Sequence, residues 1–573
     1  MYIESVPNRN SKPTILLREC WREGGKVRKR TLANLTRWPA HVVEAVRRSL
    51  SGERMVLLGE VFSIERSLPH GHVEAVLKMI KRLGLDELIA SKRCRARDLV
   101  VAMIVERLIH PCSKLATTRL WKSTTLAGEL GVAEAEVDEL YAALGWLQRR
   151  QKNIETKLAT RHLAHDELVL YDVSSSYYEG RTCPLARYGY SRDRRSDLPQ
   201  IVYGVMTDGK GCPISIDVYA GNTADPATVP EQVEKLRGRF GLSQVVLVGD
   251  RGMLTQTKIE ALKDHPGLGW ITALRSGAIR KLVGAGAIQM SLFDERNLAE
   301  ISSPEFPGER LVACYNPFLA EERRRKRGEL LAATDRELEK LALQAARPAR
   351  RAMRKEDIAV RYGKIIGRRK MEKHYIKTIE DGKLEWARNE ESIRLEEMLD
   401  GIYVVRTSEP AEKLSPENVA RSYKSLSLVE RAFRTLKGVE LRVRPIYHRL
   451  EETVRAHFCL CLLAYYVEWH MRRALRPVLF DDEELEINRT LRDPVAPAKA
   501  SGSAKRKKLT RRTVDGFDVH SFETLMIEMA TRSKNFYRPK SGSAIEPVEM
   551  IADPTPFQTR VFELLNAYPV SGN

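Results

Sequence analysis

The chain has 573 residues, of which 96 are lysine or arginine and 76 are aspartate or glutamate, so its formal net charge is +20. Hydrophobic residues make up 43% of the sequence, which excludes a disordered chain, and the length allows several folding units. The positive charge favours a polyanionic partner, chiefly nucleic acid or an anionic membrane, over a cationic ligand.

The sequence contains no run of about 18 apolar residues and no apolar segment near its start, so we expect neither a membrane span nor a signal peptide. Its eight cysteines do not form paired CxxC motifs. We therefore expect eight reduced, mostly structural thiols in a cytosolic protein, without a structural zinc site.

Residues 1–65 are expected to form a small β-rich unit. Gly24-Gly25 separates two short β-type runs, a pattern that predicts a hairpin. In residues 70–165, apolar residues recur at spacings of three and four positions, which predicts a helical domain. The basic residues interspersed there fit DNA binding, and they fit a solvated helical bundle equally well.

From 166 to 275 the pattern alternates between strands and helices, which predicts the first part of an α/β core. Helices are predicted over 225–240 and 255–263. The predicted strands cover 168–172, 200–205, 213–218, 244–250 and 269–274.

Residues 276–398 interrupt this alternation with charged, mainly helical sequence, which predicts a large insertion. The second part of the core follows at 399–475, with a strand at 400–406 and helices at 415–437 and 450–475. In the C-terminal region, 476–573, six of the eight residues at 505–512 are basic. We expect that run to be a flexible basic linker.

Two apolar strands of the predicted core each end in an aspartate, Asp172 and Asp250. Open α/β sheets bind ligands at the carboxyl ends of their strands. Two carboxylates that converge there repel each other, and Mg²⁺, which prefers carboxylate and water oxygens, relieves that repulsion. The pair therefore predicts a metal site, with two unrelated loop aspartates as the alternative.

Glu430 lies at the edge of the apolar stripe of a predicted amphipathic helix. Arg434 and Lys437 follow four and seven positions later, on roughly the same face. A carboxylate flanked by two cations suits metal ligation beside a phosphate backbone. An ordinary surface ion pair fits the same spacing.

Together these motifs resemble the DDE transposases of bacterial insertion sequences, over about 165–475. The third motif is most similar to the branch that reads Tyr-x2-Arg-x3-Glu-x6-Lys, with Leu426 in place of the arginine. The motifs that carry the resemblance are Tyr171-Asp172, Val248-Gly-Asp250-Arg-Gly252, and Tyr423 with Glu430 and Lys437.

The resemblance implies an α/β fold whose ribonuclease H-like (retroviral-integrase-like) catalytic core is interrupted by the insertion. It implies that Asp172, Asp250 and Glu430 are the catalytic residues and hold two Mg²⁺ ions, for which Mn²⁺ would substitute. Two such ions support DNA cleavage and strand transfer.

The implied DNA contacts lie close to these three carboxylates. Tyr423 and Lys437 would contact phosphates near the end of the element, and we add Arg251 and Arg434 to the expected DNA-binding residues. The implied partners are double-stranded DNA, as the terminal inverted repeats of the element and as the target, and a second copy of the chain on paired ends. No membrane partner is expected, and the implied location is the bacterial cytoplasm, at the nucleoid.

Two other functions stay open from the sequence. A ribonuclease H-like nuclease would cut DNA without joining it. A non-catalytic DNA-binding protein, such as a domesticated transposase or a repressor, would bind without either step. Converging carboxylates argue against the second, because a pure DNA-binding protein has no use for them.

Overall fold

The computed structural model describes residues 1–9, 12–53, 62–163, 167–347, 352–491, 493–540 and 548–569. The chain forms two compact units. The smaller unit comprises Met1–Leu68 and Arg532–Asp553, and the larger one comprises Pro69–Thr531 and Pro554–Asn573.

The smaller unit contains two three-stranded sheets and helix α1 (Ala40–Leu50). The predicted hairpin is present, and Gly24 and Gly25 at its turn have positive φ angles, which side chains disfavour. The first sheet consists of β1 (Tyr2–Val6), β2 (Thr14–Glu23) and β3 (Lys26–Asn34). The second consists of β4 (Phe62–Pro69), β15 (Ser533–Pro539) and β16 (Val548–Ile551), so the end of the chain returns to complete the unit that its beginning starts.

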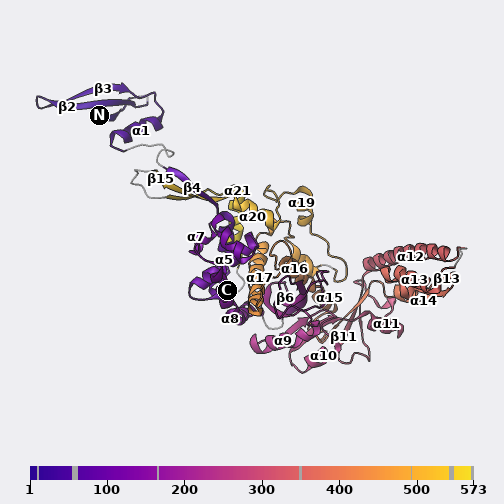
Figure 1. Ribbon diagram of the computed structural model, residues 1–573. Helices are drawn as coiled ribbons and strands as arrows, with labels where there is room; N and C mark the ends of the chain where they lie inside the picture. Colours follow the sequence, from indigo (N-terminus) through magenta and orange to yellow (C-terminus); the bar gives the residue numbers. More distant parts are fainter. Residues whose placement is uncertain are drawn as a thin grey trace. The chain divides into compact units, whose positions relative to one another are not determined.

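The larger unit begins with the predicted helical region (Figure 1). Its helices are α3 (Gly71–Arg82), α4 (Leu85–Ile89), α5 (Arg95–Ile109), α6 (Lys114–Leu120), α7 (Leu126–Leu130) and α8 (Val137–His162). Every residue of α5 from Leu99 to Leu108 is buried, as expected for a helix surrounded by others. Helix α17 (Glu451–Ala474) packs against both α5 and α8, which joins the helical region to the core.

The core is a mixed α/β structure built on one eight-stranded sheet, in the order β10-β11-β14-β9-β8-β5-β6-β7. Strands β5, β6 and β7 form an antiparallel meander, whereas β8 and β9 run parallel to β5. All five strands predicted for 166–275 are present. The strands are β5 (Leu168–Tyr177), β6 (Gln200–Asp208), β7 (Pro213–Ala220), β8 (Val245–Val248), β9 (Leu268–Ala273), β10 (Leu298–Ile301), β11 (Arg310–Tyr315) and β14 (Ile402–Thr407).

Helices accompany these strands, and α16 packs on β5 while α17 packs on β7. The helix predicted over 415–437 is two helices that meet at Ser425. The helices that accompany the sheet are α9 (Val229–Glu234), α10 (Gln256–Lys263), α11 (Ser276–Gly284), α15 (Pro416–Lys424) and α16 (Leu426–Lys437).

The structure corrects the extent of the predicted insertion. Strands β10 and β11 lie within 276–398 yet belong to the main sheet, because β11 pairs with β14. They are short, and their apolar runs lack the length that would identify a strand within charged sequence. The part that leaves the sheet has its own apolar core, and Figure 1 shows it as a separate group. It consists of α12 (Pro317–Ala345), α13 (Lys355–Arg369), β12 (Tyr375–Glu380), β13 (Lys383–Arg388) and α14 (Glu390–Glu397).

The flexible linker predicted at 505–512 is wrong, because most of this run is helix α19 (Gly502–Thr510). Lys507 is buried in the middle of the helix, and its Nζ donates to the carbonyl oxygens of Arg476 and Asp481 at 2.7 Å each. A buried ammonium with several acceptors stabilises a helix that charge repulsion alone would disfavour. The other helices of this region are α18 (Leu485–Leu491), α20 (Phe522–Ala530) and α21 (Pro556–Ala567).

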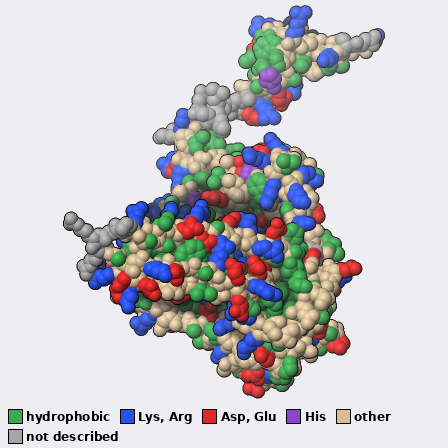
Figure 2. Space-filling model, turned by 90° about the vertical axis from the view of Figure 1, so that its right-hand side faces the viewer, with side chains coloured by type: hydrophobic (Ala, Val, Ile, Leu, Met, Phe, Trp, Pro, Cys, Tyr) green, Lys and Arg blue, Asp and Glu red, His purple; other side chains and the backbone are tan. Residues whose placement is uncertain are grey.

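The surface mixes charges of both signs. On the face drawn in Figure 2, Lys and Arg side chains alternate with Asp and Glu side chains, so the excess positive charge does not gather in one patch there. All eight cysteines are free thiols, as predicted. No helix in the described ranges combines the length and the apolar content that crossing a bilayer requires.

Candidate active site

Asp172 lies inside strand β5, and not at its end as predicted. The strand continues to Tyr177 because Ser174, Ser175 and Ser176 pair with β6 instead of forming a turn. Asp172 is therefore a strand residue and not a loop aspartate. The side chain of Asp172 is half-buried, and its Oδ1 accepts a hydrogen bond from the backbone N–H of Val173 at 2.8 Å.

The register of the two parallel strands places Asp172 and Asp250 at the same level. Leu170 on β5 pairs with Val248 on β8, and each aspartate lies two residues further along its own strand direction. After Asp250 the chain turns toward α10, since the carbonyl of Asp250 accepts the N–H groups of Met253 and Leu254. The register thus brings the positions of Asp172 and Asp250 next to each other on neighbouring parallel strands.

The electrostatics of this edge favour a cation. Burial, together with the nearby carboxylates of Asp250 and Asp225, raises the pKa of Asp172 to about 7. Arg192 opposes this effect, but both oxygens of Asp225 accept hydrogen bonds from its guanidinium, at 2.7 and 2.6 Å. Carboxylates that disfavour each other's ionised form are a donor set that a divalent cation fits, since the cation stabilises both charges.

Helices α15 and α16 carry the third predicted motif across the same strands. The hydroxyl of Tyr423, near the end of α15, donates to Oδ1 of Asp250 at 3.2 Å. At the end of α16, Nζ of Lys437 donates to the carbonyl oxygen of Ser175 on β5 at 2.6 Å. The motif is thus fixed to β5 at one end and to the residue after β8 at the other.

Glu430 lies between these two contacts, seven residues from each of the residues that make them. Its side chain is exposed and makes no hydrogen bond or ion pair within the described part of the chain. Phe433, one turn later, packs against Tyr203 of β6 with ring centroids 5.7 Å apart. Glu430 is therefore a free carboxylate on the helix that covers β5 and β6.

The structure does not gather all three carboxylates at bonding distance of one ion. Among the described residues, one group of three brings metal-ligating atoms within 4.8 Å of one another, and it comprises His162, Cys212 and His470. Asp172 and Asp250 lie on or just after neighbouring parallel strands, and Glu430 lies on helix α16.

The two predicted DNA-binding arginines, Arg251 and Arg434, are exposed. Arg251 directly follows Asp250, and Arg434 lies one turn after Glu430 on α16. A cavity of about 420 Å³ opens beside this edge and is lined by Arg192, Asp225 and other residues that include Gly252. The site therefore presents exposed positive charge next to its carboxylates.

The sequence did not predict the carboxylate that binds Lys437, which belongs to Asp193. Oδ1 of Asp193 accepts a hydrogen bond from Nζ of Lys437 at 3.0 Å and pairs with Arg444 at 2.6 Å. Burial lowers the pKa of Lys437, and the carboxylate of Asp193 partly offsets that effect. Asp193 stands in a loop with no periodicity or motif, so no signal in the sequence marks it.

Comparison with known families agrees with this geometry. A family model described as the transposase DDE domain matches residues 165–467, which is more than half of the chain. A second model, described as the N-terminal domain of IS1634 family transposases, matches residues 3–55. No curated protein matches the chain.

Proposed function

The chain belongs to the DDE-domain transposases of insertion sequences, and from this premise we propose that it binds the ends of its own element and catalyses Mg²⁺-dependent cleavage and strand transfer. The observation that supports this most directly is the level position of Asp172 and Asp250 on adjacent parallel strands. A protein that only binds DNA gains nothing from two carboxylates that repel each other.

The sheet supports a ribonuclease H-like catalytic core. Its central strands are an antiparallel meander, β5 to β7, followed by two parallel strands, β8 and β9. In the proposed core the first aspartate comes from the central strand and the second from its parallel neighbour. The glutamate comes from a helix beyond the inserted subdomain, and Glu430 on α16 occupies that place.

In the proposed mechanism Asp172, Asp250 and Glu430 hold two Mg²⁺ ions, with Mn²⁺ as a substitute. The bound ions would activate a water or a 3′-hydroxyl and stabilise the leaving oxygen of the phosphodiester. The residues of the chain prepare this site. The N–H of Val173 orients the carboxylate of Asp172, and the hydroxyl of Tyr423 orients that of Asp250.

The proposed DNA contacts follow from exposure. Arg251 and Arg434 are free to reach phosphates of double-stranded DNA at the element end or the target. Tyr423 and Lys437 already bind Asp250 and Asp193, so we expect them to hold the site in place while they border the DNA. We propose a homodimer on paired ends, because both ends must be cut together, acting in the bacterial cytoplasm at the nucleoid.

A strand-transfer assay tests the proposal. The substrate is DNA carrying the two ends of the element with Mg²⁺, and the variants are Asp172→Asn, Asp250→Asn and Glu430→Gln, with the exposed Asp264→Asn as the matched control. Each of the three variants should lose cleavage by at least about 10³-fold, as expected for loss of a metal ligand, and should still bind end DNA. Asp264→Asn should behave as the unmodified protein.

The outcomes separate the alternatives. Full activity of any one variant would remove that residue from the catalytic set. Cleavage without joined products would identify a nuclease. Binding without cleavage under any metal condition would identify a non-catalytic DNA-binding protein.

A further inference from the structure

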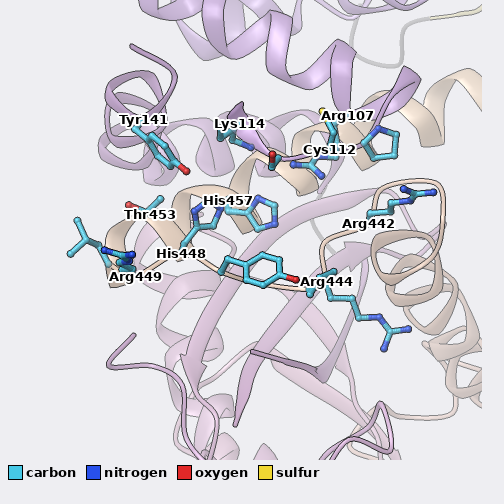
Figure 3. Close-up of a pocket in the computed structure, with 15 residues that line it drawn as sticks. Arg107, Cys112, Lys114, Tyr141, Arg442, Arg444, His448, Arg449, Thr453 and His457 are labelled. Carbon is cyan, nitrogen blue, oxygen red and sulfur yellow. The ribbon is translucent and has the colours of Figure 1, made fainter. Parts of the chain in front are cut away.

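A cavity of about 710 Å³ lies between the helical region and the core, within the larger unit (Figure 3). One wall is built by the end of α5, the start of α6 and Tyr141 of α8. The facing wall is the loop between α16 and α17 with the first residues of α17. The predicted catalytic residues do not line this cavity.

The cavity is strongly cationic. Its lining contains five basic residues and no aspartate or glutamate, and the basic residues are Arg107, Lys114, Arg442, Arg444 and Arg449. Arg444 pairs at 2.6 Å with Asp193, a carboxylate that it shares with Lys437. The acid next to Arg107 in sequence, Glu106, does not line the cavity, and burial raises its pKa to about 8, so it does not offset the charge at neutral pH.

Lys114 is the feature that most needs a ligand. Its side chain is 4% exposed, and within the described residues it makes no hydrogen bond or ion pair. Figure 3 shows it pointing into the cavity beside Arg107, which is also buried and donates one hydrogen bond, to the carbonyl of Leu441 at 3.4 Å. Burial and the nearby charge of Arg107 lower the pKa of Lys114 to about 7, so its amine is only partly charged at neutral pH. A bound anion would favour the ammonium form and relieve the cost of burying it.

Aromatic side chains complete the cavity. Two tyrosines of the lining, Tyr141 and Tyr447, are 42% and 58% exposed. The ring of Tyr141 stands edge-on to His448 at 6.0 Å, and burial lowers the pKa of His448 to about 3, so this imidazole is neutral. Exposed aromatic rings beside cations form the combination that stacks bases and binds the backbone of single-stranded nucleic acids.

We propose that this cavity binds an unpaired nucleotide of a DNA strand, with its phosphate at Lys114 and Arg107 and its base against Tyr141 and Tyr447. This proposal rests on the proposed function, because the unpaired strand would come from the cutting and joining of DNA. A duplex phosphate reaches the exposed rim, where Arg442 and Arg449 lie, but Lys114 is buried behind it. Only a strand that has left the duplex presents a phosphate that can enter.

The test measures DNA binding by the full chain in EDTA, so that catalysis plays no part. The probes are a fluorescein-labelled 12-nucleotide single strand of arbitrary sequence and the corresponding duplex. Lys114→Met and Tyr141→Leu should each weaken binding of the single strand by about tenfold and that of the duplex by less than about twofold. The matched control is Lys92→Met, an exposed lysine of the same helical region, which should change neither.

Three results would overturn the proposal. Equal weakening on both probes would mean a general electrostatic effect, and an unchanged affinity for the single strand would mean that the cavity is not used. Full displacement of the single strand by millimolar dAMP or inorganic phosphate would mean a site for free nucleotide or phosphate instead. If Lys114→Met does not fold, Tyr141→Leu still tests the cavity. The binding assay needs neither metal nor element ends, so its result does not depend on whether the protein cleaves and joins DNA.

Discussion

Tyr423 donates a hydrogen bond to Asp250 across 173 residues of sequence. The contact joins the end of α15 to the carboxylate that follows β8. In the sequence, the entire inserted subdomain lies between these two residues. The hydroxyl holds one oxygen of Asp250, while the N–H of Gly252 donates to the other at 3.2 Å. The carboxylate therefore has a fixed orientation toward Asp172 before any ligand arrives.

Tyr423→Phe removes this hydroxyl and keeps the ring. We expect single-turnover cleavage of end DNA to fall about tenfold, the size of one hydrogen bond to a charged group, with the affinity for DNA unchanged. The control is Tyr537→Phe in the smaller unit, whose hydroxyl makes no hydrogen bond in the described structure. A cleavage rate that stays at the unmodified level would show that the contact does not orient Asp250.

Glu106 makes stability depend on pH. Its carboxylate is buried without a hydrogen-bond partner among the described residues, and burial raises its pKa to about 8. Between about pH 4.5 and 8 the folded chain keeps a proton that the unfolded chain releases, so this group lowers stability as the pH rises through that window. Glu106→Gln should be close to neutral at pH 5 and should stabilise the protein by on the order of 1–3 kcal/mol at pH 8.5.

Thermal unfolding at the two pH values measures this difference. The exposed Glu87→Gln is the control and should show no pH-dependent change. A stabilisation that is the same at pH 5 and 8.5 would contradict an ionisation of Glu106.

The inserted subdomain is attached to the core through a buried ion pair. Arg327 on α12 binds Asp400, two residues before β14, through two hydrogen bonds of 3.1 and 2.6 Å. Asp400→Asn leaves the guanidinium only the more exposed Glu397, 3.4 Å away, as a charge partner, and should destabilise the subdomain by about 3 kcal/mol, the lower end for a broken buried pair. Hydrogen exchange of α12 measures this effect.

Two comparisons sharpen this prediction. The double variant with Arg327→Met and Asp400→Leu should be less destabilised than Asp400→Asn, because no charge stays buried. Arg325→Met breaks only the exposed pair with Glu329 and should cost less than about 1 kcal/mol. An equal effect of the buried and the exposed variants would show that the pair does not attach the subdomain.

Lys507 should protect a run that trypsin would otherwise cut. With α19 folded, we expect slow cleavage at 505–512 despite six basic residues in eight. Lys507→Ala removes the bonds to Arg476 and Asp481 and should speed cleavage after Arg506 or Lys508 about tenfold, which corresponds to about 1.4 kcal/mol of local stability. Lys505→Ala, an exposed neighbour, is the control, and equal acceleration by both would contradict the anchoring role.

The regular parts of the fold follow from local sequence. Apolar strands such as the run from Val245 to Val248 are predictable because burial on both faces leaves a continuous apolar pattern. The same strands indicate the edge of the sheet that carries Asp172 and Asp250. What local sequence lacks is the partner of each element, and this is why β10 and β11 were not separable from the insertion.

The charge pattern of the sequence does not show which basic side chains are buried. A basic run predicts solvent exposure, yet Lys507 is buried against backbone carbonyls that lie about 30 residues earlier in the chain. Similarly, the spacing that marks Lys437 as a DNA contact does not reveal Asp193, which is 244 residues away. Both cases depend on contacts between distant segments, which a sequence pattern does not encode.

The second sheet of the smaller unit has a consequence for how the protein is made. Strand β4 pairs with β15, and Ser63 is hydrogen-bonded to Arg538, 475 residues later. At about 5–20 residues per second, a ribosome needs roughly 25 to 95 s between these two segments. During translation the edge of β4 lacks its partner strand until Ser533–Pro539 emerges, so the smaller unit closes only after most of the larger unit has been made.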